Sequence, residues 1–138
     1  MEKSSVQSIN SSGTIFTDLT WQTEFADAWD MHDTGSNTER INIPISGRYF
    51  VLATASWEAN ATGTRELALG EIGKLNKNFN YNLISSSGST LQTRQSVSAV
   101  LYLTKGVYVK AIARQDSGGA LNVETNTTIS QFMVIRIG

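Results

Sequence analysis

The stretch SVSAVLYLTKGVYVKAIAR, residues 96–114, decides the fold class of this chain. Apolar side chains recur at every second position in residues 97–103 and again in residues 107–113. A period of two is the spacing of side chains on one face of a β-strand. Between the two runs, Thr104-Lys105-Gly106 has the length and the glycine of a tight turn. The stretch therefore predicts two long strands that pair as a hairpin.

Outward from this stretch, the rest of the chain also favours strands. Residues 47–58, GRYFVLATASWE, alternate along their length, and both faces are apolar at the start because Phe50 and Leu52 oppose Tyr49 and Val51. We expect this strand to lie centrally, between two covering layers. Further extended segments are expected at residues 14–25, 40–45, 64–72, 121–124 and 131–137, and the first hairpin strand is expected to span residues 91–103. Loops or connections are expected at 26–37, 59–63, 74–82 and 85–89.

These segments amount to about eight to ten strands, with turn signals roughly every 8 to 12 residues and no convincing helix. The pattern predicts an all-β fold, a jelly-roll β-sandwich of two antiparallel sheets. No linker or internal repeat divides the chain. We expect one sandwich domain over residues 14–138, preceded by residues 1–13 as a lead-in or an added strand.

Composition excludes several classes of protein. The 138 residues contain no cysteine, which rules out disulfides and sulfur-ligated zinc, and the net charge of -1 argues against a nucleic-acid partner. No apolar run approaches the ~20 residues that span a bilayer, and the polar start lacks the apolar centre of a secretory signal. Serine, threonine and asparagine (16, 15 and 10 residues) are frequent, and only 17% of residues are charged. This composition favours a protein located on a virion or on an extracellular surface.

The segment Trp29-Asp30-Met31-His32-Asp33 holds the only histidine and the most prominent candidate binding residues. A histidine between two aspartates can ligate a metal or act as a base, but a catalytic zinc site normally takes three protein ligands. The alternative is structural, with aspartates bonding the loop backbone and Trp29 packing the loop down. Because its neighbours are polar, Trp29 is the tryptophan best placed to contact a sugar. We therefore name Trp29, His32 and Asp33 as candidate binding residues.

The remaining chemistry gives no catalytic site and no cofactor. Asp30, Asp33 and Asp116 are candidate calcium ligands, but they lack the dense acidic spacing of an EF-hand loop, so no metal site is assigned. No pair of carboxylates is marked by spacing as glycosidase acids, and no Gly-x-Ser-x-Gly elbow or phosphate-binding glycine loop occurs. We expect a protein that is not an enzyme.

Five segments in order carry a resemblance to a known family. They are WDMHDTGS (29–36), INIPISGRYFVLATASWEAN (41–60), ATGTRELAL (61–69), SVSAVLYLTKGVYVKAIARQDSGGAL (96–121) and FMVIRIG (132–138). Together they resemble the jelly-roll superfamily of tumour necrosis factor and the complement globular heads. These segments are also similar in sequence to small domains of phage tail, fibre and collar proteins and of bacterial collagen-like proteins. The resemblance covers roughly residues 14–138. One departure is Val107-Tyr108, where the family usually has an acidic residue in the turn.

The resemblance implies a compact homotrimer whose inner sheets meet on a threefold axis. The two long strands support this, because a monomeric sandwich needs only one apolar face per strand. Tyr102, Tyr108 and Ile112 lie opposite the expected core-facing set, with Phe132 expected nearby, and we name these four as the trimer interface. The alternative is that they are ordinary exposed or core residues.

The sequence thus predicts a non-enzymatic trimeric virion module, from a phage tail, fibre or collar, that recognises a host-surface glycan or protein. An alternative is a purely structural trimerisation or capsid-decoration head without a ligand. A third alternative is a polysaccharide-active enzyme, but the spacing of acidic residues in the sequence does not mark the pair of carboxylates that such chemistry needs. No membrane insertion is expected.

Overall fold

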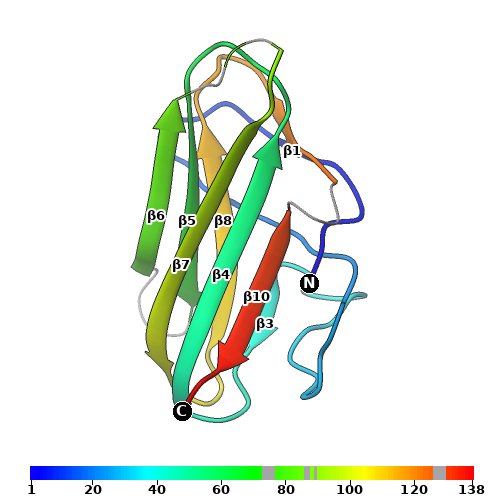
Figure 1. The fold of residues 1–138 in the computed structure, drawn as a ribbon, viewed down its shortest axis with the longest axis vertical. Helices are drawn as coiled ribbons and strands as arrows, with labels where there is room; N and C mark the ends of the chain where they lie inside the picture. Colours follow the sequence, from blue (N-terminus) through cyan, green and yellow to red (C-terminus); the bar gives the residue numbers. More distant parts are fainter. Residues whose placement is uncertain (73–76, 86–87, 89, 126–129) are drawn as a thin grey trace.

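A computed structural model describes residues 1–72, 77–85, 88, 90–125 and 130–138. In these residues the chain forms ten β-strands and no helix (Figure 1). The strands are β1 (Gln7–Ile9), β2 (Thr17–Asp18), β3 (Arg40–Asn42), β4 (Gly47–Trp57), β5 (Thr64–Ile72), β6 (Lys77–Ser85), β7 (Thr93–Leu103), β8 (Tyr108–Gln115), β9 (Leu121–Val123) and β10 (Gln131–Arg136). The all-β prediction is confirmed. In the described part of the chain, no helix has the length and apolar character to cross a membrane.

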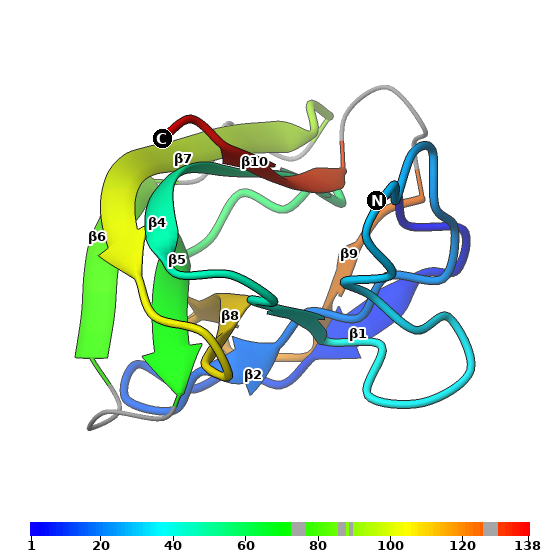
Figure 2. The same ribbon diagram turned by 90° about the horizontal axis from the view of Figure 1, so that it is seen from below.

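The strands form two five-stranded antiparallel sheets that pack face to face (Figure 2). In sheet A, β4 pairs along its whole length with β7 on one side, and with β10 and β9 on the other, while β1 extends the sheet beyond β9. In sheet B, β8 pairs with β5, β2 and β3, and β6 forms the edge beside β5. The jelly-roll sandwich of two antiparallel sheets is therefore confirmed.

The core lies between the sheets and is built from the alternating residues predicted for the long strands. Tyr49, Val51, Ala53, Ala55 and Trp57 of β4 are all fully buried. Trp57 donates its indole N–H to Gln95 Oε1 at 2.6 Å, and the Tyr49 hydroxyl donates to the Ile45 carbonyl at 2.6 Å. These bonds satisfy the polar atoms of Trp57 and Tyr49, whereas the indole N–H of the buried Trp21 has no hydrogen-bond partner among the described residues.

The predicted hairpin of residues 96–114 is wrong, although both of its strands exist. β7 pairs only with β4 in sheet A, whereas β8 belongs to sheet B. The turn between them crosses from one sheet to the other. It is fixed by bonds to a neighbouring loop, from Lys105 N to Ser46 Oγ at 2.9 Å and from Gly106 N to the Ile43 carbonyl at 2.9 Å. A crossing turn and a hairpin have the same sequence signal, since both leave odd-numbered residues facing the core.

One other segment differs from expectation. Residues 74–82 were expected as a connection, but residues from Lys77 onward form β6. The signal for that strand is the alternation of Phe79, Tyr81 and Leu83 with asparagines. Within residues 1–13, which were expected as a lead-in or an added strand, β1 pairs with β9 in sheet A and Ile9 is fully buried.

Candidate functional site

The loop between Trp21 and β3 carries the predicted binding residues, and Asp27 organises it. The Asp27 carboxylate accepts backbone N–H bonds from Trp29 at 3.3 Å and His32 at 2.8 Å. Partial burial acts to raise the pKa of Asp27, but the N–H groups of Met31, His32 and Trp29 outweigh it and hold the pKa below its usual value. Asp30 and Asn37 take positive φ angles of 51° and 52°, which suit these residue types in tight turns.

His32 holds this loop from the inside. Its side chain is buried, with Nδ1 3.0 Å from Glu24 Oε1 and Nε2 3.2 Å from the Thr38 carbonyl oxygen. Both ring nitrogens thus face oxygen acceptors of the same loop, one near its start and one near its end. The ring of His32 therefore connects two parts of the loop, whereas the half-exposed Trp29 does not pack the loop down as the structural alternative expected.

Trp29 and Asp33 lie on the outside of the loop. The Trp29 side chain is 45% exposed, which leaves much of the indole open to a ligand. Asp33 accepts bonds from the Ser36 hydroxyl at 2.6 Å and from the N–H groups of Gly35 and Ser36 at 2.7 and 3.1 Å. These bonds hold the pKa of Asp33 below its usual value. Trp29 and Asp33 are therefore the two predicted binding residues that are open to a ligand, and His32 is not.

The candidate calcium ligands separate into two places. Asp30 and Asp33 line a polar hollow of about 400 Å³ together with Glu24, His32, Thr34 and Asn42. Asp116 is elsewhere, at the start of β5, where its carboxylate accepts bonds from the Thr64 backbone and hydroxyl. In the part of the chain that the structure describes, no three histidine, aspartate or glutamate side chains gather as a metal site.

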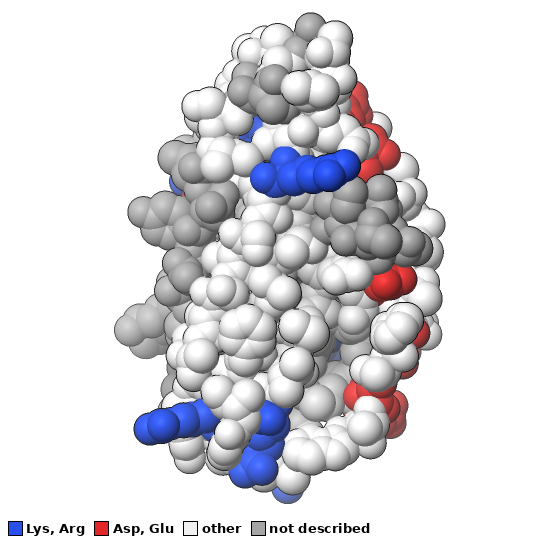
Figure 3. Space-filling view, viewed as in Figure 1, with Lys and Arg blue, Asp and Glu red and all other residues white. Residues whose placement is uncertain are grey.

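The outward face of sheet A carries a group of exposed apolar side chains. Cross-strand pairs place Phe50 beside Val100 and Ile135, and Leu52 beside Met133. The exposed apolar members of this face are Val100 (60%), Tyr102 (69%), Met133 (37%), Ile135 (45%) and Ile137 (55%). Figure 3 shows this side of the molecule with lysine and arginine near its two ends, aspartate and glutamate along one side, and neither over most of the middle. An apolar patch of this kind marks a surface that associates with another molecule.

The outward face of sheet B has the opposite character. Arg114 binds Glu66 with 2.6 Å between Nη2 and Oε2, and Lys110 Nζ lies 2.5 Å from Asp18 and 3.5 Å from Glu39. The guanidinium of Arg40 stacks over the Tyr108 ring at 4.6 Å. Charged pairs thus occupy the outward side of sheet B, where Glu66 and Lys110 are themselves largely buried, so the two outer faces of the sandwich differ in chemistry.

The structure does not bring the four predicted interface residues together. Tyr102 lies on the apolar face of sheet A, whereas Tyr108 and Ile112 are half-buried on the outward side of sheet B. Phe132 is fully buried in the core, where its ring packs on Trp21 at 5.7 Å between centroids. The four residues therefore do not form one surface. The apolar face also contains Val100 of β7, together with Phe50, Leu52, Met133, Ile135 and Ile137. The sequence signal for the last five is the apolar second face of residues 47–58 and 131–137.

Comparisons with known proteins match the fold. No protein-family model and no curated protein sequence matches this chain. Among solved structures, murine APRIL superposes with a TM-score of 0.70 at 12% identity, over 96% of this chain and 98% of that one. The globular domain of zebrafish complement 1qA gives a TM-score of 0.62 at 18% identity, covering 96% and 97%. The Eiger TNF of S. frugiperda gives 0.62 at 12% identity, covering 96% and 92%. The fold predicted by the resemblance is thus confirmed.

Proposed function

From this tumour necrosis factor-like jelly roll, we propose a non-enzymatic homotrimer that serves a phage tail, fibre or collar as a host-recognition module. The observation that carries the proposal is the apolar outward face of sheet A, formed by β7, β4 and β10. Three copies packed through this face would remove its apolar side chains from water, which is the main favourable term in association. The ion-paired face of sheet B would then remain on the outside of the assembly.

Host recognition is assigned to the loop that carries Trp29. A half-exposed indole beside polar groups is a suitable platform for a sugar ring or a protein side chain. The bonds made by Asp27 and His32 fix the loop backbone, so little order is lost when a ligand binds. A trimer presents three such loops, and this multivalency raises avidity without any new contact.

The proposal is tested by measuring binding of the purified protein to host cells and to host wall polysaccharide. Val100→Asp introduces charge into the sheet A face and should yield a monomer that binds about 10²- to 10⁴-fold more weakly, through lost avidity. Ile15→Asp is the matched control, because Ile15 is 68% exposed and lies off this face. Equal binding by the trimeric wild type and a monomeric Val100→Asp would contradict the multivalent mechanism.

The contact residue is tested in the same assay. Trp29→Ala should remove binding while leaving the mass of the assembly unchanged, since this side chain stands in the loop and not on the sheet. If the wild-type protein binds no host surface, the alternative function is favoured, a structural trimerisation or capsid-decoration head. If the polysaccharide is shortened during incubation, the chain is an enzyme and the main proposal fails.

A further inference from the structure

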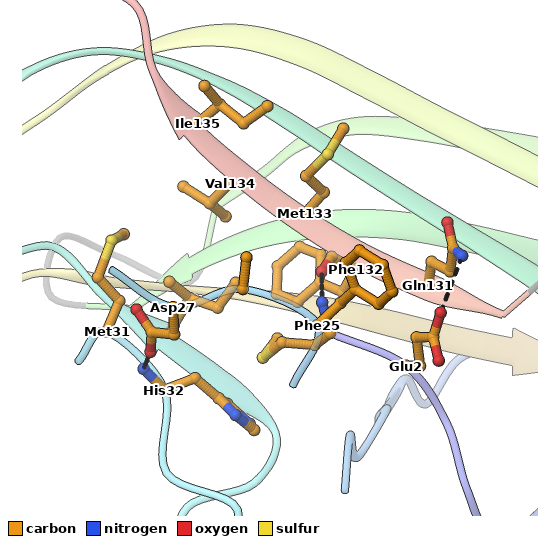
Figure 4. A pocket seen from close by; sticks show the side chains of 13 residues that line it. Glu2, Phe25, Asp27, Met31, His32, Gln131, Phe132, Met133, Val134 and Ile135 are labelled. Carbon is orange, nitrogen blue, oxygen red and sulfur yellow. Dashed lines mark hydrogen bonds between the residues drawn. The ribbon is translucent and has the colours of Figure 1, made fainter. Parts of the chain in front are cut away.

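The ring of His32 is enclosed in the recognition loop (residues 24–38) and meets an oxygen atom at each nitrogen. Its side chain is 1% exposed, with Nδ1 3.0 Å from Glu24 Oε1 and Nε2 3.2 Å from the Thr38 carbonyl oxygen. The His32 backbone N–H donates to Asp27 at 2.8 Å, and the ring points away from β10 (Figure 4). The ring therefore connects the beginning of the loop to its end.

Both of these oxygen atoms are acceptors, and this decides which form of the ring fits. A backbone carbonyl cannot donate a hydrogen bond, and an ionised carboxylate only accepts. A neutral imidazole has one N–H group, so at one of the two contacts a buried ring lone pair would face an oxygen lone pair. The imidazolium has an N–H group on each nitrogen and satisfies both oxygens. The geometry thus fits the protonated ring.

The charged groups around His32 are mainly acidic. His32 lines both the polar hollow described above and a groove of about 660 Å³ beside β10. The carboxylates of these linings are Glu2, Glu24, Asp27, Asp30 and Asp33. β3 and β10 contribute only uncharged side chains to the described linings, and Met1 supplies the one ammonium group there. The guanidinium of Arg40 in β3 stacks on Tyr108 instead. Carboxylates attract an imidazolium, and this attraction opposes the cost of burying its charge.

We propose that protonated His32 is a pH switch, which closes the recognition loop between Glu24 and Thr38 and opens it at Thr38 when the ring loses its second proton. The N–H group facing Glu24 is kept, because a hydrogen bond to a carboxylate is the stronger of the two. The lone pair on Nε2 then faces the Thr38 carbonyl oxygen, and the two atoms must separate or admit water. The closed loop holds one proton more than the open loop, so raising the pH favours opening.

The switch regulates how Trp29 is presented, and this step rests on the proposed function. Trp29 and His32 both donate their backbone N–H groups to Asp27, so the ring and the indole belong to one bonded segment of the loop. In the closed loop this segment is already ordered. In the open loop, binding must also supply the cost of ordering it. Host recognition should therefore be stronger in a mildly acidic medium than in an alkaline one.

The first test is NMR spectroscopy of the whole chain between about pH 5.5 and pH 9, which needs no host ligand. His32 is the only histidine, so its imidazole nitrogen signals report directly whether the ring carries both protons. We expect both protons at the acidic end and loss of the Nε2 proton as the pH rises. In the same step, the protection factor of the backbone N–H of His32 or of Trp21, which donates to the Thr38 carbonyl at 2.9 Å, should fall by about threefold to tenfold. A ring that keeps one protonation state throughout, or two protection factors that do not follow its titration, would overturn the proposal.

Glu24→Gln separates this switch from other titrations. The glutamine amide can donate to Nδ1 of a neutral ring, whose Nε2–H then serves Thr38, so both contacts are satisfied without a charge. The loop of this variant should stay closed at pH 9. Burial lowers the pKa of the Met1 ammonium and of Lys3, and both groups are retained in the variant. The matched control is Glu58→Gln, which removes a carboxylate outside the loop and should open as the wild type does. Opening of Glu24→Gln at the same pH as the wild type would show that the proposal is wrong.

Binding to host wall polysaccharide then tests the regulation of Trp29. The wild type should bind about threefold to tenfold more weakly at pH 9 than at pH 6, whereas Glu24→Gln should bind equally at both. Equal wild-type binding at both pH values, with a ring that titrates between them, would overturn this regulation. Absence of host binding at every pH would contradict the proposed function instead, and the NMR result would still decide whether the switch exists.

Discussion

Lys3 is a cation enclosed by the fold. It is fully buried, its Nζ donates to Gln7 Oε1 at 2.7 Å and to the Thr20 carbonyl at 2.9 Å, and it lies 5.8 Å from the centre of the Trp21 ring. Burial lowers the pKa of Lys3 from 10.5 to about 8. The two hydrogen bonds hold the N-terminal segment to the loop before Trp21, while the charge itself carries a desolvation cost.

This shift predicts a pH dependence of stability. Between about pH 8 and pH 10.5 the folded chain has released the Lys3 proton while the unfolded chain retains it. Stability rises with pH wherever the unfolded state holds more protons, so Lys3 opposes folding fully below pH 8 and less as the pH rises through this window. Denaturant unfolding of wild type and Lys3→Met at pH 7 and pH 10 measures this. The wild type should gain stability relative to the variant at pH 10, and a pH-independent difference would contradict the assignment.

At this scale the sequence identified some residues well and others not at all. The prediction that Trp29 is exposed follows from its polar neighbours, and the structural alternative for His32 follows from the aspartates around it. The actual partners of His32 could not be predicted, because Glu24 and the Thr38 carbonyl are brought to it by the path of the loop. The burial of Lys3 had no sequence signal, since lysine is rarely enclosed.

The turn into β5 depends on a glycine. Gly63 has φ of +74°, and an added Cβ would lie 2.5 Å from Asp116 Oδ1 and 2.6 Å from the Asp116 carbonyl oxygen. Asp116 is held there by hydrogen bonds from the Thr64 backbone and hydroxyl, so it cannot move away from an added Cβ without breaking these bonds at the start of β5. Only a residue without a side chain fits this position.

A glycine series separates backbone strain from crowding. Gly118→Ala, at φ of +91° with open space around it, should lose about 1–2 kcal/mol of unfolding free energy through backbone strain alone. Gly63→Ala should lose clearly more, because the contact with Asp116 is added. Gly13 has open space and no positive φ, so Gly13→Ala should change little. Thermal and denaturant unfolding rank the three, and equal losses at Gly63 and Gly118 would show that crowding at Asp116 has no effect.

At the scale of elements, periodicity located most strands, and β5 has the predicted bounds of residues 64–72. What periodicity could not reveal is which strands pair. The crossing between β7 and β8 rests on the bonds of Lys105 and Gly106 to residues 43–46, far away in the sequence. β6 was missed because its asparagines favour turns, although the alternating aromatic residues were visible.

For the whole molecule, this crossing explains why the residues named as the interface lie apart. If β7 and β8 had paired, Tyr102, Tyr108 and Ile112 would share one face, since all are even-numbered. Because the two strands lie in opposite sheets, their outward residues point to opposite sides of the sandwich. The second apolar face expected for residues 47–58 is present, since Phe50 and Leu52 lie in the apolar patch of sheet A.

The most direct test of the account is the mass of the purified protein in solution, measured by light scattering after size exclusion. The proposed trimer, packed through the apolar face of sheet A, predicts a mass of three times the 15.0 kDa chain. Val100→Asp should reduce this mass to that of one chain, while Ile15→Asp should not. A wild-type monomer at the same concentration would contradict the account, because the exposed side chains of β7 and β10 would then have no partner of their own kind.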